Sequence, residues 1–291
     1  MIDWALIGGS FLVAIVVGLT GMGGGALMTP MMMLFFNVPP LAAVSSDLVA
    51  SAVMKPVGSL VHLRRGTVNL RLVGWLCAGS VPAAFCGVFL ARAFAVTDAV
   101  KYALGVALLL AVAGMALKSW LGGRGGASNA HEIVVRPIPT LLVGTVGGLV
   151  VGVSSVGSGS LIIVALLALY PALKANQLVG TDLVQAVPLV ASAALGHVLF
   201  GDFQLDLTLS LLIGSIPGVY LGARISSRAP GGLIRALLAI VLLASALKLL
   251  DASTTFTVWA LVAATVITVV GWRVTAAGRA SRGSTDLEPA R

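Results

Sequence analysis

The run GLTGMGGGAL occupies residues 18–27, and the run GVSSVGSGSL occupies residues 152–161, inside strongly apolar sequence and 134 residues apart. Glycine-rich backbone of this kind breaks a membrane helix. Such a break is tolerated only where protein or an aqueous cavity satisfies the freed backbone groups. Two matched breaks in two halves of a chain are typical of the binding site of a transporter. We call these runs the first and second glycine motifs.

The composition of the chain indicates an all-α polytopic membrane protein. Of its 291 residues, 58% are hydrophobic and only 10% are charged, whereas a soluble domain carries about 25% charged residues. Because a membrane helix needs roughly 20 apolar residues, the apolar runs predict the following helical segments: 3–20, 26–36, 41–63, 71–92, 98–120, 137–156, 159–170, 177–200, 205–224, 232–250 and 254–273. The segments 26–36 and 159–170 directly follow the glycine motifs and are too short to span, so we expect re-entrant half-helices there.

The two halves of the chain repeat each other at an offset of about 135 residues. At this offset the SDL run at 46–48 matches the TDL run at 181–183, and His62 matches His197. Further along, GSVP at 79–82 matches GSIP at 214–217. An ordered series of matches at one offset indicates an internal duplication.

Loop charges predict that the two repeats have opposite orientations in the membrane. Arg64 and Arg65 follow the first of the matched histidines, whereas Asp202 and Asp206 follow the second. The positive-inside rule then places the first loop in the cytoplasm and the second outside. We therefore expect inverted-topology repeats in the inner (plasma) membrane, with the N-terminus outside and the C-terminal tail in the cytoplasm.

The predicted organisation has five parts. They are a first transmembrane repeat (1–121), a cytoplasmic linker (122–136), a second transmembrane repeat (137–250), an extra C-terminal transmembrane helix (251–273) and a disordered cytoplasmic tail (274–291).

The glycine motifs are the predicted binding site for an anion. A helix that restarts after a break presents free N–H groups and the positive end of its dipole, both of which favour negative charge. The alternative is close helix packing through small residues. The expected substrate-binding residues in the motifs are Thr20, Gly21, Gly23, Gly24, Gly25, Ser154, Ser155, Gly157, Ser158 and Gly159.

Three ionisable residues, Asp47, Lys55 and Asp182, lie within the apolar segments. A charge at bilayer depth costs about 2.5–3.5 kcal/mol or more, so such a residue is a candidate for function. Lys55 has Val190 as its counterpart in the second repeat, and this unmatched cation is expected to contact the substrate. Asp47 and Asp182 are expected to couple or gate transport, with helix capping as the alternative.

His62 and His197 end their segments and are candidates for gating or proton relay, with a purely structural role as the alternative. An intramembrane hydrolase built on Ser158 and His197 would lack a third group to orient the histidine. The sequence contains no zinc-protease, nucleophile-elbow or nucleotide-binding loop motif. We therefore expect no enzyme activity, metal, cofactor or nucleic acid. The expected partners are a small anion and the lipid bilayer, with a homodimer as a further possibility.

Several motifs together resemble the sulfite exporter TauE/SafE family, also called the toluene sulfonate uptake permease family. They are GMGGG (21–25), SSDL (45–48), HLRRG (62–66), SVGSGS (155–160), GTDL (180–183) and GSIPG (214–218). The resemblance covers about residues 5–250. It implies a secondary transporter, an exporter or permease, for sulfite, sulfonates or related organic anions. The resemblance leaves the direction and the coupling ion open, and we expect coupling to an ion. A passive anion channel is the alternative, and a membrane scaffold is a more distant one.

Overall fold

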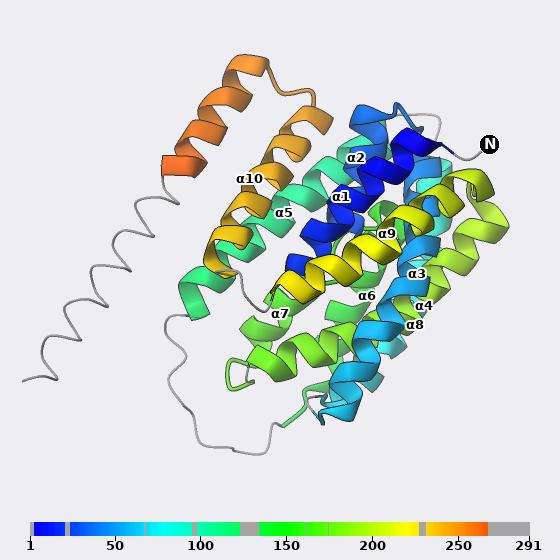
Figure 1. Cartoon of the computed structure of the whole chain (residues 1–291). Coiled ribbons are helices and arrows are strands. Elements are labelled where there is room, and N and C mark those ends of the chain that lie inside the picture. The colour runs from blue at the N-terminus through cyan, green and yellow to red at the C-terminus, as the bar shows by residue number, and fades with distance from the viewer. Residues whose placement is uncertain are drawn as a thin grey trace, which may run out of the picture.

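The computed structural model describes residues 3–20, 24–66, 68–94, 98–122, 134–159, 161–173, 175–226 and 231–266. These residues form helices and no strand (Figure 1). The helices are α1 (Trp4–Thr20), α2 (Gly25–Phe35), α3 (Pro40–Arg64), α4 (Leu70–Ala93), α5 (Ala99–Gly122), α6 (Pro137–Ser154), α7 (Leu161–Leu169), α8 (Ala175–Phe200), α9 (Leu205–Ser226) and α10 (Gly231–Leu249). A last described helix, Thr254–Val266, follows α10.

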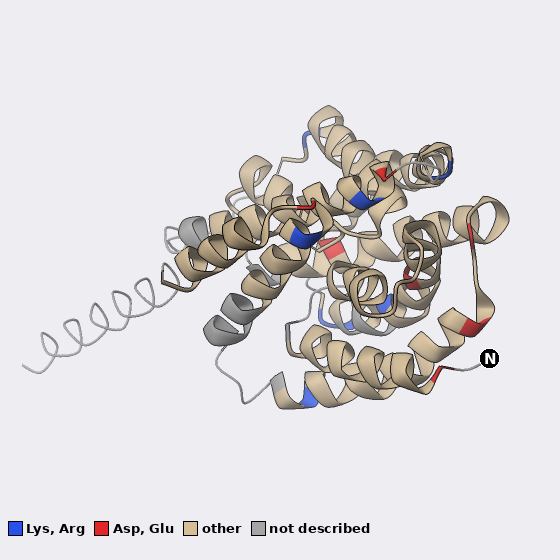
Figure 2. Ribbon diagram, turned by 90° about the horizontal axis from the view of Figure 1, so that it is seen from above, with Lys and Arg blue, Asp and Glu red and all other residues tan. Residues whose placement is uncertain are grey.

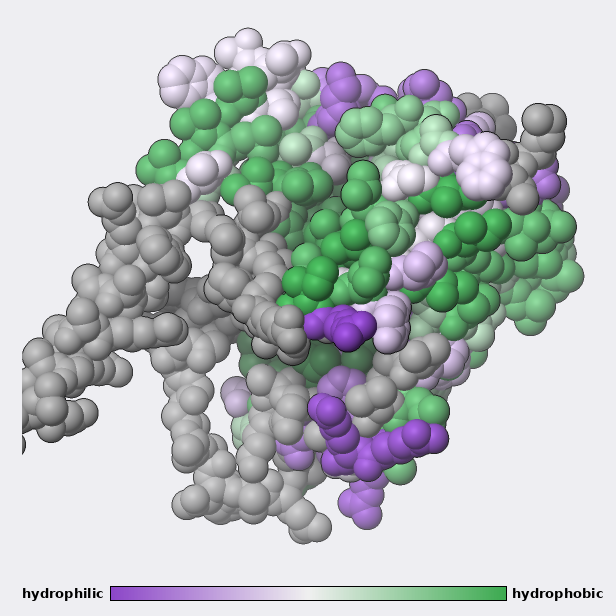
Figure 3. Space-filling view, in the orientation of Figure 1, coloured by the Kyte–Doolittle hydropathy of each residue, from purple (hydrophilic) through white to green (hydrophobic). Residues whose placement is uncertain are grey.

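The predicted all-α architecture is confirmed. Each helix from α1 to α10 begins and ends within two residues of its predicted segment. Within the described ranges, five helices are long and apolar enough to cross a membrane: Leu70–Ala93, Ala99–Leu117, Pro137–Ser154, Gln177–Phe200 and Leu205–Gly222. Hydrophobic residues cover the broad middle of the face in Figure 3, and most hydrophilic residues lie toward its ends. Charged residues are sparse along the ribbon in Figure 2.

Both glycine motifs interrupt helices as expected. The short α2 and α7, of 11 and 9 residues, restart the chain after the breaks. At 1.5 Å per residue neither can cross a hydrocarbon layer of about 30 Å. In the second break, Ser155, Gly157 and Gly159 have φ angles of 58°, 124° and 102°. Glycine reaches such angles without the steric penalty of a side chain, and this explains the glycines of the turn.

Helices from the two halves of the chain interlock. α1 packs along α9, α6 packs along α4, α3 packs against α8, and α5 packs against α10. The α1–α9 pair is visible as neighbouring helices in Figure 1. At the repeat offset α1 corresponds to α6, and α4 corresponds to α9. The α1–α9 pairing is therefore the counterpart of the α6–α4 pairing, as expected for a duplicated chain. The predicted linker (122–136), the predicted tail (274–291) and the end of the predicted last helix (251–273) lie mostly outside the described residues.

The α1–α9 and α4–α6 pairs are joined by equivalent glycines. A Cβ atom at Gly87 of α4 would lie 3.0 Å from the Cα atom of Gly152 in α6. A Cβ atom at Gly222 of α9 would likewise lie 3.0 Å from the Cα atom of Gly18 in α1. Such bare backbone surfaces allow two membrane helices to approach closely. We call these two contacts the glycine seams.

α3 and α8, the equivalent long helices of the two halves, run antiparallel to each other. Near the start of α3, Ser45 Oγ lies 2.8 Å from Nδ1 of His197, which is in the last turn of α8. Near the end of α3, Ser59 Oγ donates a hydrogen bond of 2.8 Å to the carbonyl of Leu183, near the start of α8. The α3–α8 pair contains Asp47, Lys55 and Asp182, the three ionisable residues predicted within the apolar segments.

Candidate functional site

The two glycine motifs contact each other. A Cβ atom at Gly25, the first residue of α2, would overlap the carbonyl oxygen of Ser155 and lie 2.8 Å from its Oγ atom. Ser155 directly follows the end of α6 and is 5% exposed. Glycine at position 25 therefore allows the second break to lie directly against the start of α2. The structure thus brings Gly25 and Ser155, which are predicted site residues from different halves, to one place.

Asp47 lies at the junction of the two motifs and is fully buried. Its Oδ2 atom accepts hydrogen bonds of 2.5 Å from Ser155 Oγ and 3.1 Å from Thr29 Oγ1. Its Oδ1 atom lies 3.7 Å from the position that a Cβ atom of Gly24 would take. Within the described part of the chain, Oδ1 has no hydrogen-bond partner. One carboxylate oxygen therefore holds the junction together, while the other is available to a proton or a ligand.

Lys55 connects α3 to the second glycine motif. Its Nζ atom donates a hydrogen bond to Ser158 Oγ, in the turn just before α7. The ammonium group also interacts electrostatically with Asp182 and Asp47. Asp182 is 1% exposed in α8. A half-buried ammonium group is thus bonded to a serine hydroxyl and attracted electrostatically by two buried carboxylates.

The other predicted residues of the second motif shape the break. Ser154 Oγ donates to the carbonyl of Val150 at 2.7 Å and accepts from the N–H of Val156 at 3.2 Å, so its hydroxyl satisfies the backbone where α6 ends. Gly157 and Gly159 supply the positive φ angles of the turn. In the first motif, Gly21, Gly23 and the side chain of Thr20 lie outside what the structure describes.

The two predicted histidines have different environments. His197 is fully buried and connects α8 to two other helices. Its Nε2 atom donates to the carbonyl of Gly152 at 2.8 Å, because a carbonyl oxygen can only accept. Its Nδ1 atom lies 2.8 Å from Ser45 Oγ. His62, in the last turn of α3, is partly exposed.

Three polar residues in or near this site were not predicted from the sequence. Thr29 contributes a bond to Asp47, and Ser45 contacts His197. Gln185, one turn after Asp182 in α8, donates from Nε2 to Ser80 Oγ at 2.7 Å. Each is a hydrogen-bonding residue in a largely apolar helix, and that signal could have drawn attention to it.

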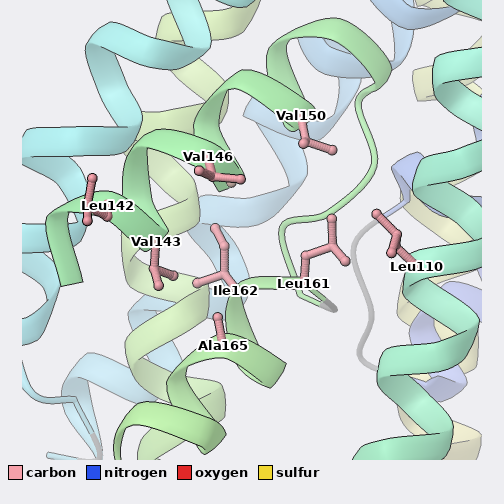
Figure 4. Close-up of a pocket in the computed structure, with 9 residues that line it drawn as sticks. Leu110, Leu142, Val143, Val146, Val150, Leu161, Ile162 and Ala165 are labelled. Atoms are coloured by element: carbon pink, nitrogen blue, oxygen red, sulfur yellow. The ribbon is translucent and has the colours of Figure 1, made fainter. Parts of the chain in front are cut away.

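A separate cavity of about 360 Å³ lies between α5, α6 and α7 (Figure 4). All of its lining residues are apolar, with Leu110 from α5, Val146 and Val150 from α6, and Leu161 and Ile162 from α7 among them. An apolar lining offers no hydrogen bond or charge to an anion. We therefore place the candidate site at the polar junction and not in this cavity. Among the described residues, no cluster of three His, Cys, Asp or Glu side chains could hold a metal ion.

Comparisons with known proteins agree with the resemblance seen in the motifs. The family model described as "Sulfite exporter TauE/SafE" matches residues 6–249. The "Probable membrane transporter protein YjnA" of Bacillus subtilis (strain 168) is 35% identical over 246 residues, which cover 82% of this chain and 96% of that protein. The "Probable membrane transporter protein YdhB" of the same organism is 24% identical over 221 residues, or 76% of this chain and 89% of that protein.

No solved structure matches the chain. The family model nevertheless covers most of the sequence and includes both glycine motifs together with Asp47, Lys55 and Asp182. The helices and the related proteins together indicate a multi-pass membrane transporter. The chain therefore belongs to the sulfite exporter TauE/SafE family.

Proposed function

We propose that this protein is a secondary transporter of sulfur-containing or related organic anions, such as sulfite or sulfonates, in the inner membrane. The observation that carries the proposal is the contact between Lys55 and Ser158 at the junction of the two glycine motifs. An ammonium group and a hydroxyl group both donate hydrogen bonds, and sulfite and sulfonate oxygens accept them. The positive end of the α7 dipole adds to the attraction for an anion.

The contact between Lys55 and Ser158 is half-buried, and the buried groups of the junction strengthen its recognition of an anion. Asp47 is fully buried, and Ser155, which bonds to it, is 5% exposed. In a site with little water, a charge interacts more strongly with its neighbours than it does in solution. An arriving anion can replace the Ser158 hydroxyl as the partner of the Lys55 ammonium. Lys55 and Ser158 are then the primary substrate ligands, and Gly25 and Ser155 set the shape of the site.

The charges of the junction favour coupling to a cation. Two buried carboxylates, Asp47 and Asp182, interact electrostatically with one ammonium, Lys55. An anion added to this arrangement would leave an excess of negative charge in a low-dielectric environment, which is strongly unfavourable. Protons on the carboxylates remove that excess. We therefore infer that Asp47 and Asp182 bind protons when the anion binds and release them when it leaves.

The antiparallel pairing of α3 and α8 supports the inverted-topology hypothesis. These two helices are repeat equivalents, and their contacts join Ser45 to His197 and Ser59 to Leu183. In inverted repeats, both breaks can meet near the middle of the membrane. The contact of Gly25 with Ser155 agrees with such a meeting. The site would then open to alternate sides as the halves rock against each other.

Reconstituted protein tests the proposal directly. Radiolabelled sulfite and a small alkyl sulfonate are offered to proteoliposomes, with a carboxylate as the competing anion class. We expect Lys55→Met to reduce anion flux about tenfold, since hydrogen bonds that involve a charged group contribute about 1.5–3 kcal/mol. Lys248→Met is the matched control, because Lys248 is exposed at the end of α10. Equal flux in both variants would contradict the role of Lys55.

The same vesicles separate a transporter from a passive anion channel. A coupled transporter accumulates the anion above its external concentration when a proton gradient is imposed, and its flux saturates. If the anion only flowed down its own concentration gradient and never accumulated, the protein would be a passive anion channel and not a transporter. Absence of flux for every sulfur anion, together with flux of a carboxylate, would reassign the substrate class.

A further inference from the structure

Ser51 is a buried hydroxyl group in α3, about one helical turn after Asp47 and one turn before Lys55. Its side chain belongs to a residue that is only 2% exposed. The Oγ atom has no hydrogen-bond partner among the residues that the structure describes. A buried polar group without a partner is unfavourable, so its presence needs a physical explanation.

Other serines of α3 satisfy their hydroxyl groups within the helix. Ser59 Oγ donates to the carbonyl of Lys55 at 3.0 Å, and Ser45 Oγ donates to the carbonyl of Leu41 at 2.7 Å. A serine in a helix commonly bonds in this way to the carbonyl four residues earlier. Ser51 has the same option but does not make this bond. The backbone of α3 therefore does not use the Ser51 hydroxyl.

The geometry of α3 directs Ser51 toward the junction of the two glycine motifs. Because successive residues lie about 100° apart around an α-helix, Ser51 lies about 40° from Asp47 on one side and about 40° from Lys55 on the other. Asp47 borders Gly24, at the start of α2, and Lys55 bonds to Ser158, just before α7. Ser51 thus points between the two breaks.

The contacts of Gly24 support this placement. A Cβ atom at Gly24 would lie 3.7 Å from Oδ1 of Asp47 and 3.7 Å from Cε of Met54. Ser51 lies between these two residues on the same side of the helix, four residues after Asp47 and three before Met54. Gly24 therefore lies over the strip of α3 that contains Ser51. Oδ1 of Asp47, which also has no partner within the described part of the chain, lies on this strip as well.

We propose that Ser51 is a third hydrogen-bond donor to the transported anion and selects a head group with three oxygens over a carboxylate. Lys55 and Ser158 provide donors on the α7 side of the junction. A sulfite or sulfonate group presents three oxygens that accept hydrogen bonds, whereas a carboxylate presents two. When two oxygens are bound by Lys55 and Ser158, only the larger head group has an oxygen left for Ser51. The inference rests on the proposed function, because it takes Lys55 and Ser158 as substrate ligands.

The second repeat agrees with a role for Ser51 in binding and not in packing. At the offset of 135 residues Ser51 corresponds to Ala186, just as Lys55 corresponds to Val190. Ala186 is 1% exposed, so the equivalent helix buries a methyl group at this position and packs without a hydroxyl. Both donors that α3 directs into the junction are therefore specific to the first repeat.

Thermal unfolding of the full-length protein in detergent tests the selection. Methanesulfonate and acetate, which both carry one methyl group, are titrated, and their stabilisation of the fold gives an apparent Kd for each. We expect Ser51→Ala to weaken methanesulfonate binding about tenfold, the order expected for the loss of a hydrogen bond to a charged group. Acetate binding should be nearly unchanged. Ser51→Cys should have an intermediate effect, because a thiol is a weak donor of similar size.

Ser46→Ala is the matched control. Ser46 also lies in α3, is fully buried and has an Oγ atom without a hydrogen-bond partner within the described ranges. It lies about 140° around the helix from Ser51 and therefore faces away from the junction. This variant should bind both anions as tightly as the unmodified protein does.

The melting temperature without an added anion separates a binding role from a structural one. Ser51→Ala removes a buried hydroxyl that has no partner, so the anion-free variant should melt at the same temperature as the unmodified protein or at a higher one. A lower melting temperature would indicate that Ser51 stabilises the fold and would overturn the inference. Unchanged methanesulfonate binding, or equal weakening of both anions, would also overturn it.

The same titrations distinguish failure of this inference from failure of the proposed function. If the unmodified protein binds acetate and not methanesulfonate, the proposed substrate class is wrong, and the selection by Ser51 is wrong with it. If the unmodified protein prefers methanesulfonate and Ser51→Ala keeps that preference, the substrate class stands and only the role of Ser51 is excluded.

Discussion

Gly25 is the position where a single added methyl group has the most direct effect on the junction. Its Cβ atom would overlap the carbonyl oxygen of Ser155. We expect Gly25→Ala to destabilise the protein by about 1–3 kcal/mol, the usual effect of overpacking, and to lower its melting temperature. Gly8→Ala in α1 is the control, because its Cβ atom would have no neighbour within 4 Å. Tryptophan fluorescence during heating in detergent measures both variants, and equal shifts would contradict the close contact.

Asp47 provides a second test on the scale of one residue. Asp47→Asn keeps the size of the side chain but cannot ionise, and it replaces charge-assisted bonds from Ser155 and Thr29 with neutral ones. We expect proton-driven anion uptake to fall about tenfold and to lose its dependence on the imposed pH gradient. Asp202→Asn, at an exposed position, should retain both properties. If anion uptake by the Asp47→Asn variant still depended on the imposed pH gradient, Asp47 would be excluded as the proton carrier.

On the scale of helices, an exposed cluster fastens α5 to the chain that follows α10. Lys101 Nζ lies 2.7 Å from both carboxylate oxygens of Asp251, and Tyr102 donates to Asp251 at 3.0 Å. The bonds from Lys101 and Tyr102 hold the pKa of Asp251 below its ordinary value. A lowered pKa means that the ionised carboxylate stabilises the folded state. That stabilisation is present above the ordinary value of 3.8 and is lost as the pH falls through the lower pKa of the folded protein.

We therefore expect Asp251→Asn to lower the melting temperature slightly at pH 7. The difference from the unmodified protein should shrink as the pH is lowered below 3.8, the ordinary value for this carboxyl group. It should also shrink in high salt, because exposed ion pairs are screened. Asp98→Asn is the comparison, since Asp98 influences Lys101 only at longer range. A difference that grows toward low pH would have the wrong sign for this cluster.

The positions of the helices could be predicted from the sequence because they depend on local features. The length of an apolar run sets each span, and the glycine motifs mark where α1 and α6 end. The partners of the site residues could not be predicted in this way. Thr29 and Asp47 are 18 residues apart, and Ser45 and His197 are 152 residues apart. These contacts exist only after α2, α3 and α8 have packed together.

On the scale of the whole molecule, the inverted arrangement predicts the sides of two loops. Arg65, after α3, and Asp202, after α8, are both exposed. In a background without Cys77 and Cys86, Arg65→Cys should react with a membrane-impermeant maleimide only from the cytoplasmic side. Asp202→Cys should react only from the outside. Labelling of both cysteines from the same side of intact cells or inverted vesicles would contradict the inverted repeats.

The glycine seams bear on the origin of the molecule. Because α1 lies along α9 and α6 lies along α4, each half completes its packing only with a helix of the other. A half produced alone would expose the bare backbone of Gly18 and Gly87, or of Gly152 and Gly222. An ancestor with a single repeat would have covered this glycine backbone by forming a homodimer of two identical copies. In a duplicated chain the two copies can change separately, which explains why Lys55 of the first half has Val190 as its counterpart in the second.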